Sequence, residues 1–351
     1  MKYKLASLFS GCGGMDLGAE GGFTFLGTDY KKHPIETVYA MDFDEKAATI
    51  YNLNFRKKLQ VIDIRNLESK EVPDHDILTG GFPCQSFSVL AQNPKRLGYK
   101  DSKGMLFFEM CRILKEKSPA VFVAENVKGI LSANKKEAFP LILAEFEKCG
   151  YHVKYALMNA AHFGVPQKRE RVFIVGFKSL ESYENFSFPT PTHINNFEPL
   201  SKVLLPNEKI EEKYYFSQRA VDGMLNTKNS KTMNKGRAQN TDLPCNTVAS
   251  HLAKVSLNST DPVLFQNGRY RMFTPREVAR IQSFPDEFNL VESKTINYRG
   301  LGNAVAPAMM WHITNSVVNA LDYRLLKINS LKIKNNIQLS STTSESNIFA
   351  L

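Results

Sequence analysis

The alternation of short apolar runs with helical patterns most strongly constrains the fold of this 351-residue chain. The runs that predict strands are Leu5–Phe9, Val38–Met41, Asp76–Thr79, Ala120–Ala124 and Val172–Phe177. Between them, Gly104–Lys117 places its apolar side chains on one helical face, and Lys135–Cys149 is helical in pattern up to Gly150. We therefore predict an α/β fold in which crossover helices connect the strands of one sheet.

The character of the chain changes after Phe177, where proline, asparagine, serine and threonine become frequent. We expect residues 1–178 to form the first domain and residues 179–297 a separate small domain. Within the small domain, Thr274-Pro275-Arg276-Glu277 predicts a helix start with a capping box. A helix over 298–325 is expected to return to the first domain, and residues 326–351 are expected to form a poorly ordered tail.

Composition limits the partners and the compartment. The 45 Lys and Arg residues against 35 Asp and Glu give a net charge of +10, which weakly favours a polyanionic partner. The five cysteines form no C-x-x-C pair, so we expect no metal site and no disulfide framework, and a reducing, cytoplasmic location fits. No apolar run approaches the roughly 20 residues that span a bilayer, so no membrane association is expected.

Three features at the ends of predicted strands favour an adenosine-type ligand. Gly11, Gly13 and Gly14 follow the first strand, where glycine lets the backbone turn sharply and approach a ligand. Asp42 ends the second strand and Asp63 ends another apolar run, positions that suit nucleoside contacts in a doubly wound sheet. Each feature alone is explained as well by a plain turn or a solvated carboxylate. Their occurrence in this order favours the ligand.

Cys84 is the candidate nucleophile. Pro83-Cys84-Gln85 follows the strand Asp76–Thr79 and a pair of glycines, and α/β sheets carry out chemistry at this end of their strands. The alternative is a small buried hydrophobe, the usual role of a free cysteine. Pro244-Cys245-Asn246 is a nearly identical tripeptide that follows no apolar strand, and we assign Cys245 to this second role.

A carboxylate and a charge cluster flank the last two predicted strands. Glu125 ends Ala120–Ala124, where a buried carboxylate is costly without a partner or a task. Gln167–Arg171 leads into the final strand, and Arg169 and Arg171 would share one face of an extended segment. That face could point at a phosphate, a base or Glu125; the alternative is a solvated charge cluster.

Read in order, these segments resemble the motifs of bacterial DNA cytosine C5-methyltransferases, the modification partners of restriction systems. The match covers nearly all of residues 4–325 and leaves out a variable stretch at about 179–265. The motifs are Phe9–Gly14 (FSGCGG), Gly81–Ser86 (GFPCQS), Glu125–Val127 (ENV), Gln167–Arg171 (QKRER), Thr274–Glu277 (TPRE), Ala279–Pro285 (ARIQSFP) and Gly302-Asn303. The resemblance implies a Rossmann-like methyltransferase fold, a mixed sheet with helices on both faces, plus a smaller, irregular target-recognition domain.

The resemblance also implies a reaction. S-adenosylmethionine (SAM) would donate a methyl group to C5 of a cytosine that is flipped out of duplex DNA, because the ring atoms are not reachable inside a duplex. Cys84 would add to C6, which makes C5 nucleophilic. Glu125 would hold and protonate N3, Arg171 would contact the base and Glu125, and Arg169 would help to position the base or the catalytic loop.

Contacts with the cofactor and with DNA carry over in the same way. Asp42, which stands where the family often has glutamate, would bind the ribose; Gly27–Glu36 resembles an insertion before its strand. Asp63 would accept from the adenine amino group. The implied SAM contacts are Phe9, Gly11, Gly13, Asp42, Phe43, Asp63, Ile64, Pro83, Leu106 and Asn303. The implied DNA contacts are Ser88, Lys95 and Arg96, in a mobile loop over Gln85–Asp101, and Arg237 and Thr247 in the small domain.

The implied partners are double-stranded DNA and a cognate restriction endonuclease, and a monomer is expected. One alternative is a tRNA cytosine C5-methyltransferase with the same core, which would carry a Cys-Phe-Thr tripeptide; here Asn246 follows Cys245. Another is a catalytically silent SAM-binding DNA module, which the presence of Cys84, Glu125 and Arg171 argues against. The sequence does not specify the DNA target.

Overall fold

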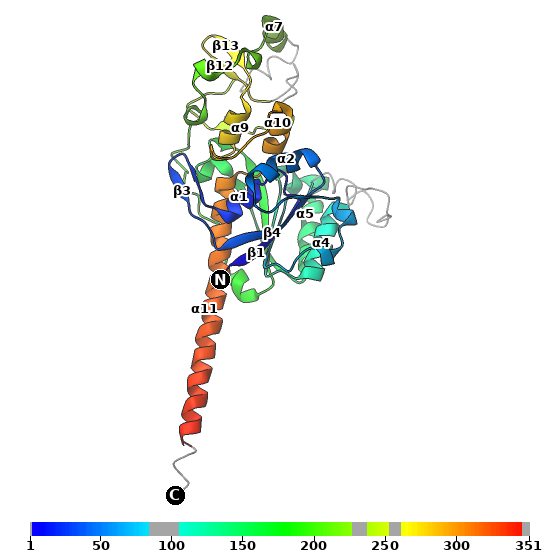
Figure 1. The fold of residues 1–351 in the computed structure, drawn as a ribbon, viewed down its shortest axis with the longest axis vertical. Coiled ribbons are helices and arrows are strands. Elements are labelled where there is room, and N and C mark those ends of the chain that lie inside the picture. Colours follow the sequence, from blue (N-terminus) through cyan, green and yellow to red (C-terminus); the bar gives the residue numbers. More distant parts are fainter. Residues whose placement is uncertain (1, 84–104, 227–236, 253–260, 346–351) are drawn as a thin grey trace.

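A single central sheet organises the protein. The computed structural model describes residues 2–83, 105–226, 237–252 and 261–345. The strand order is β5-β4-β1-β6-β7-β10-β8 (Figure 1). The strands are β1 (Tyr3–Leu8), β4 (Ile35–Asp42), β5 (Gln60–Val61), β6 (Ile77–Gly80), β7 (Val121–Val127), β8 (His152–Asn159) and β10 (Glu170–Phe177).

Within this sheet, β10 runs against its neighbours. It pairs antiparallel with β7 and β8, whereas the other pairs are parallel. The first residues of β10 therefore lie at the same edge of the sheet as the last residues of β1, β4, β6 and β7. This edge, which we call the carboxyl edge, collects side chains from segments that are far apart in the sequence.

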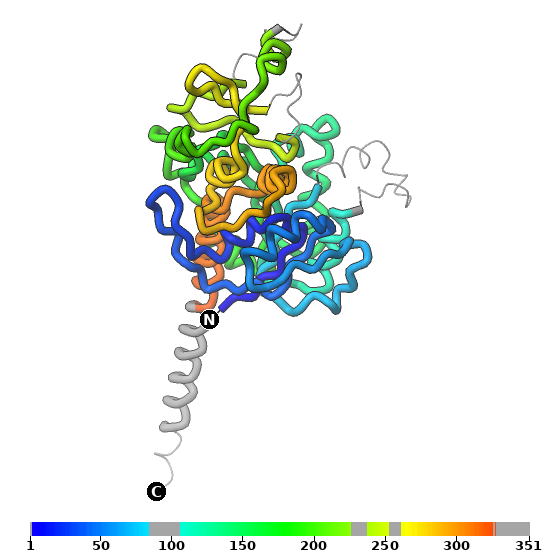
Figure 2. The backbone as a smooth tube through the Cα atoms, turned by 45° about the horizontal axis from the view of Figure 1, so that its top comes forward, coloured from blue at the N-terminus to red at the C-terminus, as the bar shows by residue number. Residues whose placement is uncertain are grey.

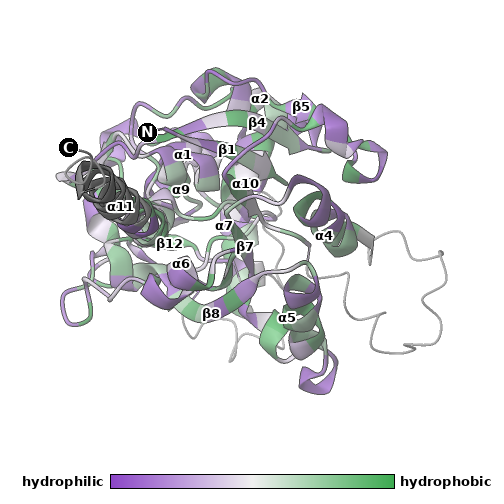
Figure 3. Ribbon diagram, turned by 90° about the horizontal axis from the view of Figure 1, so that it is seen from below, coloured by the Kyte–Doolittle hydropathy of each residue, from purple (hydrophilic) through white to green (hydrophobic). Residues whose placement is uncertain are grey.

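Helices cover both faces of the sheet, as Figure 3 shows from below. On one face α1, α2 and α11 share a core with strand residues such as Leu5 and Phe173. On the other face α4 and α5 pack against residues such as Leu78 and Phe122. These helices are α1 (Gly14–Glu20), α2 (Glu45–Asn54), α4 (Met105–Lys117), α5 (Ala138–Lys148) and α11 (Pro307–Glu345). Strand side chains alternate between the faces, so the buried strands are apolar on both sides.

The small domain is built mainly from turns and short elements. It is drawn at the top of Figure 1, and Figure 2 shows the chain around residue 300, in orange, running between it and the N-terminal part. Its elements are α7 (Gln218–Asn226), β11 (Cys245–Asn246), β12 (Leu264–Gln266), β13 (Arg269–Arg271), α9 (Pro275–Ile281) and α10 (Lys294–Asn303). β11 pairs in parallel with β9 (Gln167–Lys168), so a two-residue ladder joins the small domain to the charge cluster.

A buried ion pair organises the hairpin and helix of the small domain. The Arg271 guanidinium contacts both carboxylate oxygens of Glu277 at 2.8 Å, and both side chains are fully buried. Glu277 also accepts from the backbone N–H of Thr274, and the Thr274 hydroxyl accepts from the backbone N–H of Glu277. The predicted capping box of α9 is thus confirmed, and its acidic residue also neutralises a buried cation.

The mixed α/β fold and every predicted strand are confirmed, with ends that shift by a few residues. Helix α11 begins at Pro307 and continues to Glu345, so it extends beyond residue 325 into the segment expected to form the tail. The segment Gly27–Glu36, which resembled an insertion, contains part of the hairpin of β2 (Phe23–Phe25) and β3 (Thr28–Tyr30). Helix α6 (Leu180–Asn185) packs against β8, β10 and α11. Within the described ranges, no helix combines the length and apolar character that crossing a membrane would require.

Candidate active site

The antiparallel pairing of β7 and β10 brings Glu125 and Arg171 together at the carboxyl edge. Glu125 lies opposite Phe173, and Arg171 lies opposite Val127, so the two side chains are diagonal neighbours in the ladder. The Nε of Arg171 is 2.8 Å from Oε1 of Glu125. Both side chains are nearly buried, with 13% and 12% of their surface exposed. A charge-assisted bond of this kind fixes the direction of the carboxylate.

Burial and two neighbouring arginines have opposite effects on the pKa of the Glu125 carboxyl group. Burial raises the pKa of this carboxyl group, while the positive charges of Arg171 and Arg169 oppose that shift. The net pKa is above the ordinary value for glutamate. A carboxyl group with a raised pKa and a fixed direction can hold a proton and donate it to a ring nitrogen.

The segment that leads to Cys84 lies beside Glu125. A Cβ added to Gly81 would come within 3.1 Å of Glu125 Oε2, so only glycine leaves that carboxylate oxygen unobstructed. The side chain of Asn126 donates to the carbonyl of Phe82 at 2.9 Å. Asn126 is a positioning residue that the motif includes but that sequence reasoning assigned no role. Cys84 itself lies outside the described residues, as do Ser88, Lys95 and Arg96.

The glycine turn after β1 offers space for a ligand. The backbone N–H of Gly11 donates to Asp42 Oδ2 at 2.8 Å, which joins the ends of β1 and β4. Gly11 has a φ of +57°, and an added Cβ would meet no atom within 4 Å. Phe43, next to Asp42, leaves 64% of its surface exposed, so its ring is accessible to a ligand. An open cradle, a carboxylate and a free ring fit a nucleoside.

Two further carboxylates lie near this turn, one of them unforeseen. Asp63 forms an ion pair with Arg65, and that partner holds the Asp63 pKa below its usual range. Asp16, in the first turn of α1, is fully buried and accepts from the hydroxyls of Ser7 and Tyr51, each at 3.0 Å. No signal in the sequence separates Asp16 from a surface residue of an amphipathic helix.

The other implied SAM contacts surround the same region. Phe9, Pro83 and Leu106 are partly buried, Ile64 and Gly13 are buried, and Asn303, the last residue of α10, is exposed. They come from the ends of β1, β6 and α10, from the start of α4 and from the segment after β5.

Arg169 occupies a different position from Arg171. Its side chain is almost completely buried, and its guanidinium donates to the carbonyls of Val248, Gly302 and Ala304 at 2.8–3.0 Å. Burial, followed by the charge of Arg171, lowers the Arg169 pKa to about 9. Arg169 therefore joins the charge cluster to the small domain and to the turn before α11, which is a positioning role.

Two buried amides reinforce this junction. The Gln167 side chain donates to Gln282 Oε1 at 2.8 Å and accepts from the backbone N–H of Val248 at 2.9 Å. Gln282 in turn donates to the carbonyl of Leu301. Gln167 and Gln282 belong to motifs of the sequence, but their roles were not predicted because their partners are more than 15 residues away.

The proposed contacts of the small domain fall into two groups. Thr247 is exposed, and its hydroxyl donates to the carbonyl of Lys168 at 2.8 Å, close to the carboxyl edge. Arg237 is buried, and its Nε donates to the carbonyl of Asp261 at 3.1 Å, so it is held by the protein. Cys245 is completely buried, and burial raises the pKa of its thiol, which fits the role of a small hydrophobe.

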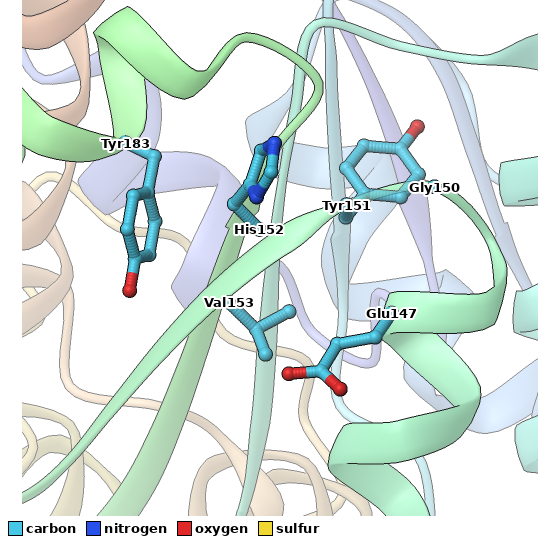
Figure 4. Close-up of a pocket in the computed structure, with 6 residues that line it drawn as sticks. All are labelled: Glu147, Gly150, Tyr151, His152, Val153 and Tyr183. Atoms are coloured by element: carbon cyan, nitrogen blue, oxygen red, sulfur yellow. The ribbon is translucent and has the colours of Figure 1, made fainter.

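A pocket of about 430 Å³ lies away from these residues (Figure 4). Its lining comes from the end of α5, the start of β8 and α6, and includes Glu147, Tyr151, His152 and Tyr183. The start of β8 is at the edge opposite to Glu125, because β8 runs parallel to β7. None of the candidate site residues lines this pocket. Among the described residues, no group of His, Cys, Asp or Glu is arranged to hold a metal ion.

The fold is that of an α/β enzyme, and the carboxyl edge collects a buried carboxylate–arginine pair and an open glycine turn that fit a nucleobase and a nucleoside. Residues 3–319 match the model of the family described as C-5 cytosine-specific DNA methylase. The chain belongs to this family, and it is a DNA cytosine C5-methyltransferase.

Similar proteins agree with this assignment. The Type II methyltransferase M1.ScrFI of Lactococcus lactis subsp. cremoris is 36% identical over 92% of this chain and 79% of its own length. The Type II methyltransferase M.Bsp6I of Bacillus sp. is 34% identical over 91% of this chain and 99% of its own. A methyltransferase structure from Entamoeba histolytica has a TM-score of 0.69 at 18% identity, covering 92% of this chain and 99% of that one; this likeness concerns the fold.

Proposed function

We propose that this enzyme transfers the methyl group of SAM to C5 of a cytosine in double-stranded DNA, with Cys84 as a transient covalent nucleophile. The observation that carries the proposal is the Glu125–Arg171 pair, which lies beside the segment leading to Cys84. The open cradle at Gly11 and the exposed ring of Phe43 support SAM as the donor. Bound SAM would supply an electrophilic methyl group.

The residues of the chain then account for the electron flow. The Cys84 thiolate adds to C6 while the Glu125 carboxyl group donates its proton to N3, so the ring becomes an enamine that is nucleophilic at C5. Arg171 holds the carboxyl group of Glu125 toward the cytosine ring. After C5 has gained the methyl group, a base removes the C5 proton, the C5–C6 double bond reforms and the Cys84 thiolate leaves. Glu125 regains the proton from N3.

The small domain would choose the target sequence. Its segment around Thr247 reaches the carboxyl edge, where it could contact a cytosine that has been flipped out of the duplex. The names of the similar proteins suggest that the enzyme protects DNA from a cognate restriction endonuclease. We expect it to act in the cytoplasm as a monomer.

A mechanism-based adduct tests the proposal. Fluorine cannot leave C5 as a cation, so a duplex with 5-fluorocytosine at the target, incubated with SAM, should remain bonded to the protein. We expect a protein–DNA band that survives boiling in detergent and that peptide mapping places on Cys84. Cys84→Ser should give no band, Glu125→Gln should slow its formation, and Cys245→Ser is the matched control that should leave it intact. An enzyme that methylates ordinary cytosine but never forms the adduct would refute covalent catalysis.

A further inference from the structure

The segment after β5 carries the proposed adenine contacts, yet it has little regular structure of its own. It consists of two short 3-10 turns, Ile64–Asn66 and Ser69–Glu71, joined by Leu67 and Glu68. The backbone N–H of Ile62 donates to the carbonyl of Asp42 at 3.0 Å, and beyond Ile62 no strand pairing holds this segment up to β6. Its apolar anchors are Ile64 and Leu67, each 2% exposed. Something other than a ladder must therefore fix the direction of its polar groups.

One guanidinium lies at the centre of this segment. Arg112 Nη2 donates to the carbonyl of Leu67 at 2.7 Å and to that of Ile64 at 3.3 Å. Arg112 Nη1 donates to the Ser69 hydroxyl at 2.7 Å, and Nε donates to Glu109 at 2.7 Å. The planar fork of arginine thus contacts both 3-10 turns and their linker at once, which a flexible ammonium group could not do equally well.

The carboxylate of Asp63 depends on the same segment. Asp63 Oδ1 accepts from the backbone N–H of Arg65 at 3.0 Å, so it caps the first 3-10 turn. The Arg65 side chain pairs with the same carboxylate. Both partners of Asp63 therefore belong to the turn whose carbonyl at Ile64 is held by Arg112. A displacement of the turn would displace the carboxylate with it.

We propose that Arg112 is a positioning residue that sets the selectivity of the cofactor site for adenine. This inference rests on the proposed use of SAM. Two groups of a protein can distinguish an adenine from a 6-oxopurine. One is an acceptor for the adenine amino group, and the other is a backbone N–H that donates to N1, which in a 6-oxopurine carries a hydrogen. Asp63 and Ile64 can offer both only while their turn is held in place. Arg112 supplies that support from α4, the helix that also carries Leu106 and that follows residues 84–104 directly.

Binding measurements without turnover test the inference. Titration calorimetry would compare S-adenosylhomocysteine with S-inosylhomocysteine, in which the amino group is replaced by oxygen and N1 carries a hydrogen. A site that hydrogen-bonds the amino group should reject the inosine form by on the order of 100-fold or more. Arg112→Met keeps the long stem but removes all donors. We expect it to weaken S-adenosylhomocysteine binding by about 10-fold and to reduce the preference to below about 10-fold.

Two further variants make the result specific. Glu109→Gln is the matched control, because Glu109 accepts a hydrogen bond from Arg112 and its interaction with the turns is only through that arginine. The glutamine oxygen can still accept this bond, so selectivity for adenine should stay at the wild-type level. Arg112→Lys should recover part of the selectivity that Arg112→Met loses. An Arg112→Met protein that binds weakly but keeps the full preference would overturn the inference. A wild-type protein that binds neither compound would instead refute the proposed use of SAM.

Discussion

Replacing Asp16 with asparagine should make the stability of the protein less dependent on pH. The Asp16 carboxyl group is fully buried and accepts from two hydroxyl donors, and no cation among the described residues forms an ion pair with it. Burial is the largest cause that raises its pKa, from the ordinary 3.8 to about 7, while the bonds from Ser7 and Tyr51 oppose the shift. The folded protein therefore keeps the Asp16 carboxyl group protonated over a pH range in which the unfolded chain has released that proton.

The sign and size of the effect follow from linkage. Between about pH 4 and pH 7 the unfolded state binds fewer protons at this position than the folded state does, so the free energy of unfolding falls as the pH rises. The contribution of the Asp16 proton to the free energy of unfolding is present in full below about pH 4 and is lost as the pH rises through about 7. A pKa raised from 3.8 to about 7 corresponds to about 4 kcal/mol in total, of which about 2.5 kcal/mol falls between pH 5 and pH 8.

Urea unfolding followed by circular dichroism would measure the effect. Wild type and Asp16→Asn are compared at pH 5 and at pH 8, so that titrations common to both proteins cancel. From pH 5 to pH 8, we expect the free energy of unfolding of the wild type, relative to that of the variant, to fall by about 2.5 kcal/mol. Asp74→Asn is the control: Lys117 lowers the Asp74 pKa, so both its titrations lie below pH 5. An unchanged difference between wild type and Asp16→Asn at the two pH values would refute the reasoning.

Three other predictions concern activity, the small domain and specificity. Cys84→Ala should abolish transfer of tritiated methyl groups, whereas Cys245→Ala should retain it; equal activities would contradict the proposed mechanism. Glu277→Gln should destabilise the protein in urea by about 3–5 kcal/mol, because Arg271 is left as a buried charge without its counter-ion; an unchanged midpoint would show that the pair contributes nothing. Exchanging residues 179–265 for those of a relative with a different target should change the DNA sequence that bisulfite sequencing finds methylated. An active chimera that still methylates the original target would show that recognition lies elsewhere.

Much of the sheet could be predicted because its strands are buried on both faces. Runs such as Val172–Phe177 are then apolar without interruption and are bounded by turn residues. The missed strand β8 is the edge strand of the sheet, and His152, Tyr155 and Leu157 are exposed along it. An edge strand that is solvated on one side has no such run, and its pairing with β10 is decided by tertiary contacts.

The candidate site divides in the same way. Glu125 could be singled out because a carboxylate that closes an apolar strand conflicts with its surroundings. Asp16 produces no such conflict in the sequence, since a polar residue is ordinary in the first turn of a helix. Gln282 and Arg112 act through carbonyl groups that the fold brings to them, and any residue can provide a carbonyl. Roles of this kind can be recognised only in the three-dimensional structure.

The pairing of α1 with α11 bears on how the protein is made. The residues of α1, such as Met15 and Ala19, belong to one core with Met310 and Ile313 of α11, nearly 300 residues later. While the ribosome is still synthesising the small domain, α1 and α2 can cover part of that face of the sheet, but the apolar surface that α11 buries stays exposed, and such surface favours aggregation or chaperone binding. A nascent or truncated chain that stops before α11 lacks part of its core. We therefore expect methylation to require that α11 has docked onto α1.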